Sequence, residues 1–252
     1  MPTLPVFLVD ELPAAAATVL DGPEGRHAAT VRRIRVGEQL LLSDGRGGLA
    51  RCTVTGTHRE ALDLRVERSW TVAPPQPRVV LAQALVKGDR GELAVELATE
   101  AGVDVVLPWR AARCVARWDD GPRGAKALAR WRSTAREAGK QSRRAWLPEV
   151  AEPVSTAQLA ERVRAAAGAL VLHESADLPI ARAGLPASGD LVIVVGPEGG
   201  ITEDELGRLV EAGAQPVRLG PTVLRASTAA AVALGALGVL TDRWATGGHL
   251  SE

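Results

Sequence analysis

The pattern of apolar and polar positions along the chain changes near residue 75. Before that point, short runs alternate apolar with polar residues, and turn signals such as Asp44-Gly45 separate them. The predicted strands are Pro5–Val9, Gln39–Ser43, Leu49–Thr55 and Ala61–Arg68, and a short helix is predicted over His27–Arg35. About five strands in roughly seventy residues are typical of a small β-barrel.

A proline-rich segment, Ala73–Pro77, ends this region. Proline lacks a backbone N–H, so this segment joins neither a helix interior nor a central strand, and we interpret it as a linker. Beyond it, apolar strands alternate with helical patterns, which is typical of an α/β domain with a largely parallel sheet. The sequence therefore predicts a β-barrel domain over residues 1–72, a linker over 73–77 and an α/β domain over 78–252.

The predicted elements of the α/β domain follow one another closely. The strands are Arg78–Leu85, Val103–Leu107, Ala169–Leu172, Leu191–Val195 and Pro216–Leu219. The helices are Asp89–Ala101, Gly124–Ser142, 155–167, 202–213 and 226–244, followed by a frayed end over Ala245–Glu252. Leu191–Val195 is the most apolar strand, so we expect it in the middle of the sheet.

Composition excludes several classes of protein. Hydrophobic residues make up 46% of the 252 residues and charged residues 24%, as in ordinary globular domains. The chain has no recognisable signal peptide and no run of about 20 apolar residues, so we expect no membrane span. Two cysteines and four histidines form neither a disulfide framework nor a metal-binding pattern, which favours a reducing cytoplasmic setting and no metal.

Charge is unevenly distributed, although the formal net charge is zero. Pro108–Val150 holds eleven Lys and Arg residues against four Asp and Glu, whereas Asp190–Ala214 holds six acidic residues and one Arg. A local basic segment is the usual electrostatic signature of a surface that binds phosphates. A solvated helix also carries such charges, so the segment by itself leaves both readings open.

A glycine-rich turn at residues 196–200 (GPEGG) follows the most apolar strand. Thr202 and Glu205 then form the sequence signature of a capping box for the next helix. Ligands of α/β sheets bind at the carboxyl ends of strands, and glycine lets the backbone approach them closely. The turn has neither G-x-G-x-x-G nor Gly-Lys-Ser/Thr, so it does not match the nucleotide-phosphate loops.

Two other strand ends carry residues suited to binding. Leu219 and Gly220 open a second glycine turn that leads to Arg225, whose planar cation is suited to clamping a phosphate or a carboxylate. His173 and Glu174 follow a third strand. A lone histidine is more often structural, but a third loop at the same edge of the sheet gives these residues more weight.

Together these residues resemble a known family. The motifs are GPEGGIT-x-x-E, RLGP-x-x-LR-x-x-TA, LVKGDR followed by E-x-x-TEAGV, and EAGKQSRR-x-x-x-P. They are similar to the RsmE family of SAM-dependent 16S rRNA uridine N3-methyltransferases, within the SPOUT superfamily. HAATVRRIRVGE resembles the family's N-terminal PUA-like barrel, so the resemblance covers nearly the whole chain. The chain departs from the pattern at Thr222 and Ser227, where many members carry a basic residue and Glu.

The resemblance implies a particular fold and set of partners. The C-terminal domain would contain a deep trefoil knot, contrary to the usual rule that chains do not thread loops. Three knot loops would bind S-adenosyl-L-methionine (SAM), and the functional unit would be a homodimer. The substrate would be a uridine in the decoding region of 16S rRNA, within the small ribosomal subunit.

The resemblance also implies roles for individual residues. Arg225 and Glu198 are the expected catalytic residues: Arg225 would stabilise the uracil anion or a phosphate, and Glu198 would accept a proton or organise the knot loop. The expected SAM-binding residues are Leu172, His173, Glu174, Gly196, Pro197, Gly199, Gly200, Ile201, Leu219, Gly220, Leu224 and Ser227. The expected RNA-binding residues are Lys87, Arg110, Arg113, Arg143 and Arg144.

Two other functions remain open at this stage. One is a different SPOUT methyltransferase, most plausibly a ribose 2′-O-methyltransferase. The other is an RNA-binding assembly factor that keeps the fold without catalysis. The nucleoside made by the protein separates the first from uridine N3 methylation, and SAM binding argues against the second.

Overall fold

A computed structural model of the chain describes residues 4–245 and divides it into two compact units. Among the described residues, the N-terminal unit contains those up to Pro74 together with Lys140–Leu147, and the C-terminal unit contains Pro75–Gly139 and residues 148–245. The sequence-based division had placed 140–147 in the α/β domain. The expected frayed end lies outside the described residues after Ala245.

A five-stranded sheet in the order β1-β3-β4-β5-β2 forms the N-terminal unit within the described residues. Its strands are β1 (Val6–Leu8), β2 (Ala17–Leu20), β3 (Gln39–Ser43), β4 (Gly48–Thr57) and β5 (Leu62–Thr71). The pairs β3–β4, β4–β5 and β2–β5 are antiparallel, whereas β1 pairs with β3 in parallel. Alternate residues of these strands enclose a small core of their own.

The region between β2 and β3 differs from the expectation. Helix α1 (Gly22–Arg26) begins five residues before the predicted start, and it continues as a π-helix, η1, which ends at Val31 rather than Arg35. Pro23 at the first helical turn favours this earlier start. Strand β2 has the sequence ATVL, in which apolar residues fall on both faces and only Leu20 is buried. The strand therefore lacks the alternation of apolar and polar residues that would have predicted it.

The segment 140–147 packs onto this N-terminal sheet. Lys140 forms a shielded ion pair with Glu24, with 2.7 Å between Nζ and Oε2. Trp146 donates from Nε1 to the carbonyl of Val72 at 2.9 Å, and Gly47 donates its N–H to Ala145 at 2.9 Å. These contacts explain why the segment belongs to the N-terminal unit although it lies beyond the linker in the sequence.

The C-terminal unit contains a six-stranded parallel sheet within the described residues, in the order β11-β9-β10-β6-β7-β8. Its strands are β6 (Arg78–Ala84), β7 (Val105–Trp109), β8 (Glu149–Val150), β9 (Gly168–Leu172), β10 (Asp190–Val195) and β11 (Gln215–Val217). Strand β10 lies between β9 and β6, which confirms its predicted central place. Strand β8 was missed because two residues are too few to show a pattern.

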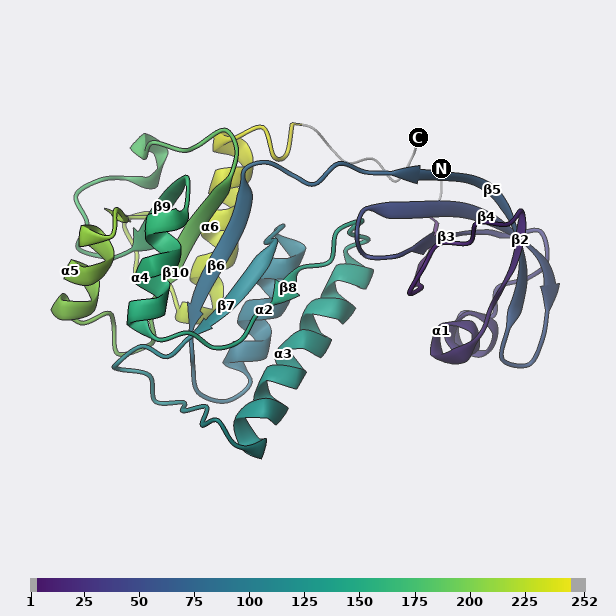
Figure 1. Cartoon of the computed structure of the whole chain (residues 1–252), viewed down its shortest axis with the longest axis horizontal. Coiled ribbons are helices and arrows are strands. Elements are labelled where there is room, and N and C mark those ends of the chain that lie inside the picture. Colours follow the sequence, from purple (N-terminus) through teal and green to yellow (C-terminus); the bar gives the residue numbers. More distant parts are fainter. Residues whose placement is uncertain (1–3, 246–252) are drawn as a thin grey trace. The chain divides into compact units, whose positions relative to one another are not determined.

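Helices lie on both faces of this parallel sheet (Figure 1). They are α2 (Arg90–Glu100), α3 (Pro122–Gln141), α4 (Thr156–Ala165), the 3₁₀ turn η2 (Ile180–Arg182), α5 (Glu203–Glu211) and α6 (Ala226–Leu240). Helix α6 packs against α2, β6 and β10, and α4 packs against α5. Helix α6 ends at Leu240, four residues before the predicted end.

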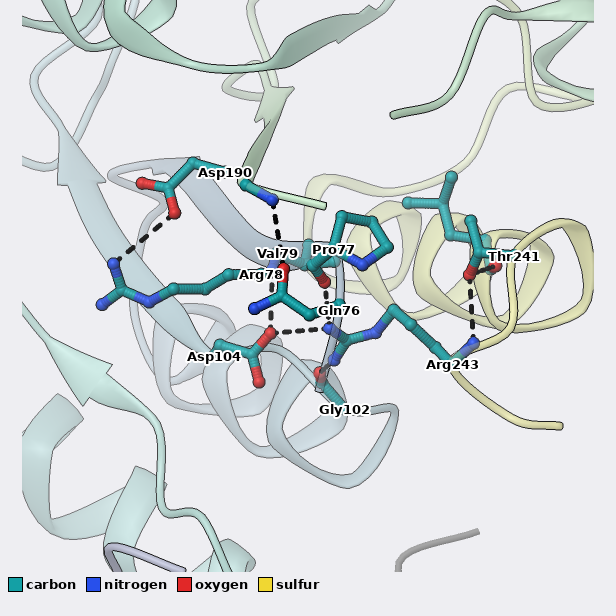
Figure 2. A network of polar contacts seen from close by, with 11 residues as sticks. Gln76, Pro77, Arg78, Val79, Gly102, Asp104, Asp190, Thr241 and Arg243 are labelled. Carbon is teal, nitrogen blue, oxygen red and sulfur yellow. Dashed lines mark hydrogen bonds and ion pairs between the residues drawn. The ribbon is translucent and has the colours of Figure 1, made fainter. Parts of the chain in front are cut away.

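The end of α6 is tied to the start of β6 by a buried arginine (Figure 2). The Arg243 side chain is 7% exposed and lies 2.8 Å from the Asp104 carboxylate, measured from Nη1 to Oδ2. Arg243 also donates to the carbonyl of Pro77, and to that of Gly102 at 2.5 Å. The same Asp104 oxygen accepts the N–H of Val79 at 2.8 Å. One ion pair thus joins three separate segments of the unit.

We predict that Arg243→Met destabilises the protein by about 3 kcal/mol, because it leaves the Asp104 carboxylate buried without its cation. Calorimetric unfolding measures the change. The matched control is Arg208→Met, which removes an exposed pair with Asp204 on α5 and costs less than about 0.5 kcal/mol. Equal losses in the two variants would contradict a structural role for the Arg243 ion pair.

Candidate functional site

A cavity of about 1140 Å³ opens at the carboxyl ends of β9, β10 and β11. Three loops form most of it: residues 172–174 after β9, 195–201 after β10 and 218–225 after β11. These strands are parallel, so their carboxyl ends meet at one edge of the sheet. The cavity therefore lies where α/β sheets bind their ligands.

All the residues predicted to bind the cofactor line this one cavity. They are Leu172, His173, Glu174, Gly196, Pro197, Gly199, Gly200, Ile201, Leu219, Gly220, Leu224 and Ser227. The two predicted catalytic residues, Glu198 and Arg225, line it as well. Residues up to 55 positions apart in the sequence are thus brought together by strand order, and their roles remain to be tested.

The predicted RNA-binding residues are divided between the two units. Arg113 lines the cavity, and Lys87 lies beside Glu198. Arg110 is exposed and pairs with Asp120 at 2.7 Å. Arg143, whose φ of 57° is in the left-handed region, belongs with Arg144 to the segment that packs on the N-terminal unit.

Some lining residues were missed by the sequence-based prediction. The main ones are Val86 and Arg90 after β6, Pro179, and Arg218 at the end of β11. Applying the strand-end argument to β6 would have drawn attention to Arg90. Pro179 had no such signal, because it lies in an irregular segment that reaches the site by pairing with Arg218.

The glycine turn after β10 leaves little room for side chains at two positions. A Cβ atom on Gly196 would lie 2.7 Å from Cγ1 of Ile201, and one on Gly199 would lie 3.1 Å from Cβ of Arg113. Gly200 has a φ of +74°, which favours glycine. Arg113 Nη1 donates to the carbonyl of Gly199 at 3.1 Å, so the loop after β7 holds this turn in place.

One buried carboxylate, that of Glu205, links the loops around the turn. Glu205 is 4% exposed. Its Oε2 accepts two hydrogen bonds from Thr202, one from the N–H at 3.2 Å and one from the hydroxyl at 3.0 Å, and these complete the predicted capping box. Its Oε1 accepts the N–H of Ala112 at 2.8 Å and the Thr156 hydroxyl at 3.0 Å. Glu205 therefore joins the starts of α5 and α4 to the loop that carries Arg113.

Glu198 faces the loop after β6. Its Oε1 lies 3.4 Å from the backbone N of Lys87, which donates to it, and 3.9 Å from Nη1 of Arg90. The carboxylate therefore bridges the glycine turn and the start of α2. Arg225 occupies the N-cap position of α6 in extended conformation, is exposed and lines the same cavity.

Cys114 lies under the loop that carries Arg113. Burial raises the pKa of its thiol, and the Sγ atom is 3.7 Å from the carbonyl of Trp109. A raised pKa keeps the thiol neutral, and a neutral thiol is a poor nucleophile. Cys114 is therefore a buried residue whose thiol donates a hydrogen bond to Trp109.

The described residues contain neither a metal-binding group of side chains nor a membrane-spanning helix. Residues 4–245 contain no group of three or more His, Cys, Asp or Glu side chains that could hold a metal ion. No helix in that range is long and apolar enough to cross a membrane.

Comparisons with known proteins identify the class. Residues 74–238 match the model of an RNA methyltransferase domain, and residues 20–67 match that of an RNA methyltransferase PUA domain. In structure, the chain is similar to a ribosomal RNA small subunit methyltransferase E from Neisseria gonorrhoeae bound to S-adenosyl methionine. The TM-score is 0.81 at 27% identity, covering 95% of this chain and 98% of that one. A Legionella pneumophila protein solved with bound SAM has a TM-score of 0.83 at 26% identity, covering 95% and 98%.

Curated relatives narrow the class to one family. The chain is 58% identical to ribosomal RNA small subunit methyltransferase E of Mycobacterium bovis, over 95% of this chain and 93% of the relative. It is 32% identical to the protein of that name from Bacillus subtilis, over 93% of each. The chain belongs to the ribosomal RNA small subunit methyltransferase E family, as its motifs predicted.

We predict that Glu205→Gln loosens the loop after β7, because an amide nitrogen replaces one acceptor oxygen and the charge is lost. The expected destabilisation is about 2–3 kcal/mol. Amide hydrogen exchange at residues 112–114 should accelerate. The matched control is Ser155→Ala, which removes only the local cap of α4 and costs about 1 kcal/mol. Unchanged exchange at Ala112 in Glu205→Gln would show that the carboxylate is only a helix cap.

Proposed function

We propose that this protein transfers a methyl group from SAM to N3 of a uridine in the decoding region of 16S rRNA, within the small ribosomal subunit. The observation that carries the proposal is the single cavity lined by all the residues predicted for the cofactor and for catalysis. Family membership and relatives solved with SAM support it.

The residues that line the cavity fit SAM. The volume, about 1140 Å³, lies slightly above the usual range for small-molecule sites, which are mostly apolar with a few placed polar groups. Ile201, Leu219 and Leu224 provide apolar wall, and the backbone of the glycine turns approaches without side chains. When bound, SAM supplies a methyl group on a positively charged sulfur, which is an electrophile.

Residues of this chain would activate the methyl acceptor, uracil N3. Uracil N3 is a poor nucleophile until its proton leaves or is shared, so a base and an anion-stabilising group are needed. Glu198 is suited to accept the proton, because its carboxylate lies between the cavity and the start of α2. Arg225, which lines the same cavity, is suited to stabilise the uracil anion or an adjacent phosphate.

The trefoil knot belongs to this proposal. Strand β11 is at the edge of the sheet, yet the next helix, α6, packs against α2 and against the central strands β6 and β10. The chain therefore returns from the edge to the centre of the sheet, as a threaded end requires. The Arg243 ion pair holds the end of that returning segment.

A homodimer is also part of the proposal, supported by the exposed face of α6. This helix contains no charged residue. One face is buried, whereas Val232, Val239 and Leu240 on the other are 47%, 75% and 42% exposed. A helix that is apolar all round is normally covered, and clustered exposed apolar residues mark interaction surfaces. A second copy is the partner that the family resemblance implies.

RNA binding would involve both units. The match to an RNA methyltransferase PUA domain supports a docking role for the N-terminal unit. Lys87, Arg110 and Arg113 in the C-terminal unit, and Arg143 and Arg144 in the N-terminal unit, remain candidates for phosphate contacts. We place this activity in the cytoplasm, where small ribosomal subunits are found in bacteria.

Gly199→Val is expected to weaken SAM binding at least about tenfold, or 1.4 kcal/mol. The branched side chain would press on Arg113 and displace the turn that forms the cavity wall. Isothermal titration calorimetry measures the affinity. Gly207→Val is the control, because a Cβ at Gly207 meets nothing within 4 Å. Wild-type SAM affinity in Gly199→Val would place the cofactor elsewhere.

Mass spectrometry of the product nucleoside tests the reaction itself. The wild-type protein, given SAM and small ribosomal subunits that lack the modification, should form 3-methyluridine.

Arg225→Ala should keep SAM affinity within about threefold while methylation is almost lost, because an anion-stabilising group acts mainly in the transition state. Arg208→Ala, an exposed arginine on α5, should match wild type. A 2′-O-methylated nucleoside would overturn the N3 assignment, and no product would favour an assembly factor.

A further inference from the structure

A second hollow adjoins the cofactor cavity. We call this hollow the side recess. It has a volume of about 760 Å³ and is lined by Lys87, Gly88, Asp89, Arg90, Leu93, Val115 and Glu198. Its residues come from the start of α2, the loop after β7 and the glycine turn after β10. None of the roles proposed above accounts for this hollow as a whole.

The side recess and the cofactor cavity share two lining side chains. Arg90 and Glu198 line both hollows, and Nη1 of Arg90 lies 3.9 Å from Oε1 of Glu198. The same Glu198 oxygen accepts the N–H of Lys87. An occupant of the recess would thus contact the side chains of Arg90 and Glu198, which also line the cavity.

The walls of the side recess combine apolar and charged groups. Leu93 and Val115 are 41% and 65% exposed, and both line the hollow. Lys87 and Arg90 add two exposed cations, and the carboxylates of Asp89 and Glu198 add hydrogen-bond acceptors. Enzymes that modify a nucleobase hold it unpaired between apolar or aromatic side chains and read its pairing edge with hydrogen bonds. The cations complement the phosphates on either side of such a base.

We infer that the side recess binds the uracil base of the unpaired target uridine. Leu93 and Val115 contact the faces of the ring, Glu198 faces its N3 edge at the boundary with the cofactor cavity, and Lys87 and Arg90 contact the flanking phosphates. This assignment rests on the proposed function, and it adds Arg90, Leu93 and Val115 to the residues that select the substrate.

Filling the side recess tests the inference. Val115→Trp introduces a bulky ring at an exposed position, and Val115→Asp introduces a charge that repels phosphate and leaves the apolar wall incomplete. Both variants should lower kcat/KM for small ribosomal subunits at least about tenfold, mainly through KM for RNA. SAM affinity should stay within about threefold of the wild-type value, because Val115 lines the side recess and not the cofactor cavity. The unfolding midpoint should stay at the wild-type value, because Val115 is an exposed loop residue.

The matched controls are Val210→Trp and Val210→Asp, at a valine of α5 that is 44% exposed and lines neither hollow. Wild-type kcat/KM in both Val115 variants would overturn the assignment, as would equal losses in the Val210 controls. Absence of SAM binding or of methylation in the wild-type protein would instead overturn the proposed function. If either Val115 variant fails to fold, Leu93→Ala supplies the measurement, with the same rise in KM expected.

Discussion

The candidate site depends on one buried carboxylate. Glu205 accepts hydrogen bonds from the start of its own helix, from the Thr156 hydroxyl at the start of α4 and from the backbone of Ala112. A buried charge is tolerated only where such bonds satisfy it, so these segments are held in a single arrangement. Arg113, the residue after Ala112, in turn holds the carbonyl of Gly199. The shape of the cavity wall follows from these linked contacts.

A second constraint acts at the opposite end of the parallel sheet. The Arg243–Asp104 ion pair ties the segment after α6 to the residues that precede β6 and β7. Because α6 begins at the cavity with Arg225 and ends at this pair, the helix is fixed at both ends. Order at the loop after β11 is therefore coupled to packing at the far end of the sheet.

The charged segments have more than one use. Part of the basic segment pairs within the protein: Arg130 with Glu92, Arg132 with Glu152 and Lys140 with Glu24. Part of the acidic segment is built into the site, since Glu198 and Glu205 organise the turn after β10. A count of charges along the sequence cannot separate these uses, because it contains no information on which charges meet.

The sequence by itself determined the architecture and the three strand-end loops that form most of the cavity. Apolar strands followed by glycine turns gave the parallel sheet, the central place of β10 and the residues at its carboxyl edge, because strand period and turn chemistry are local properties. Two short strands were not predicted from the sequence. Strand β2 lacks an alternation of apolar and polar residues, and β8 has only two residues. Only the tertiary structure decided that Glu205 links three segments, that Arg90 and Val115 form a recess beside Glu198, and that 140–147 packs on the N-terminal unit. These are contacts between residues far apart in the chain, and local patterns do not encode them.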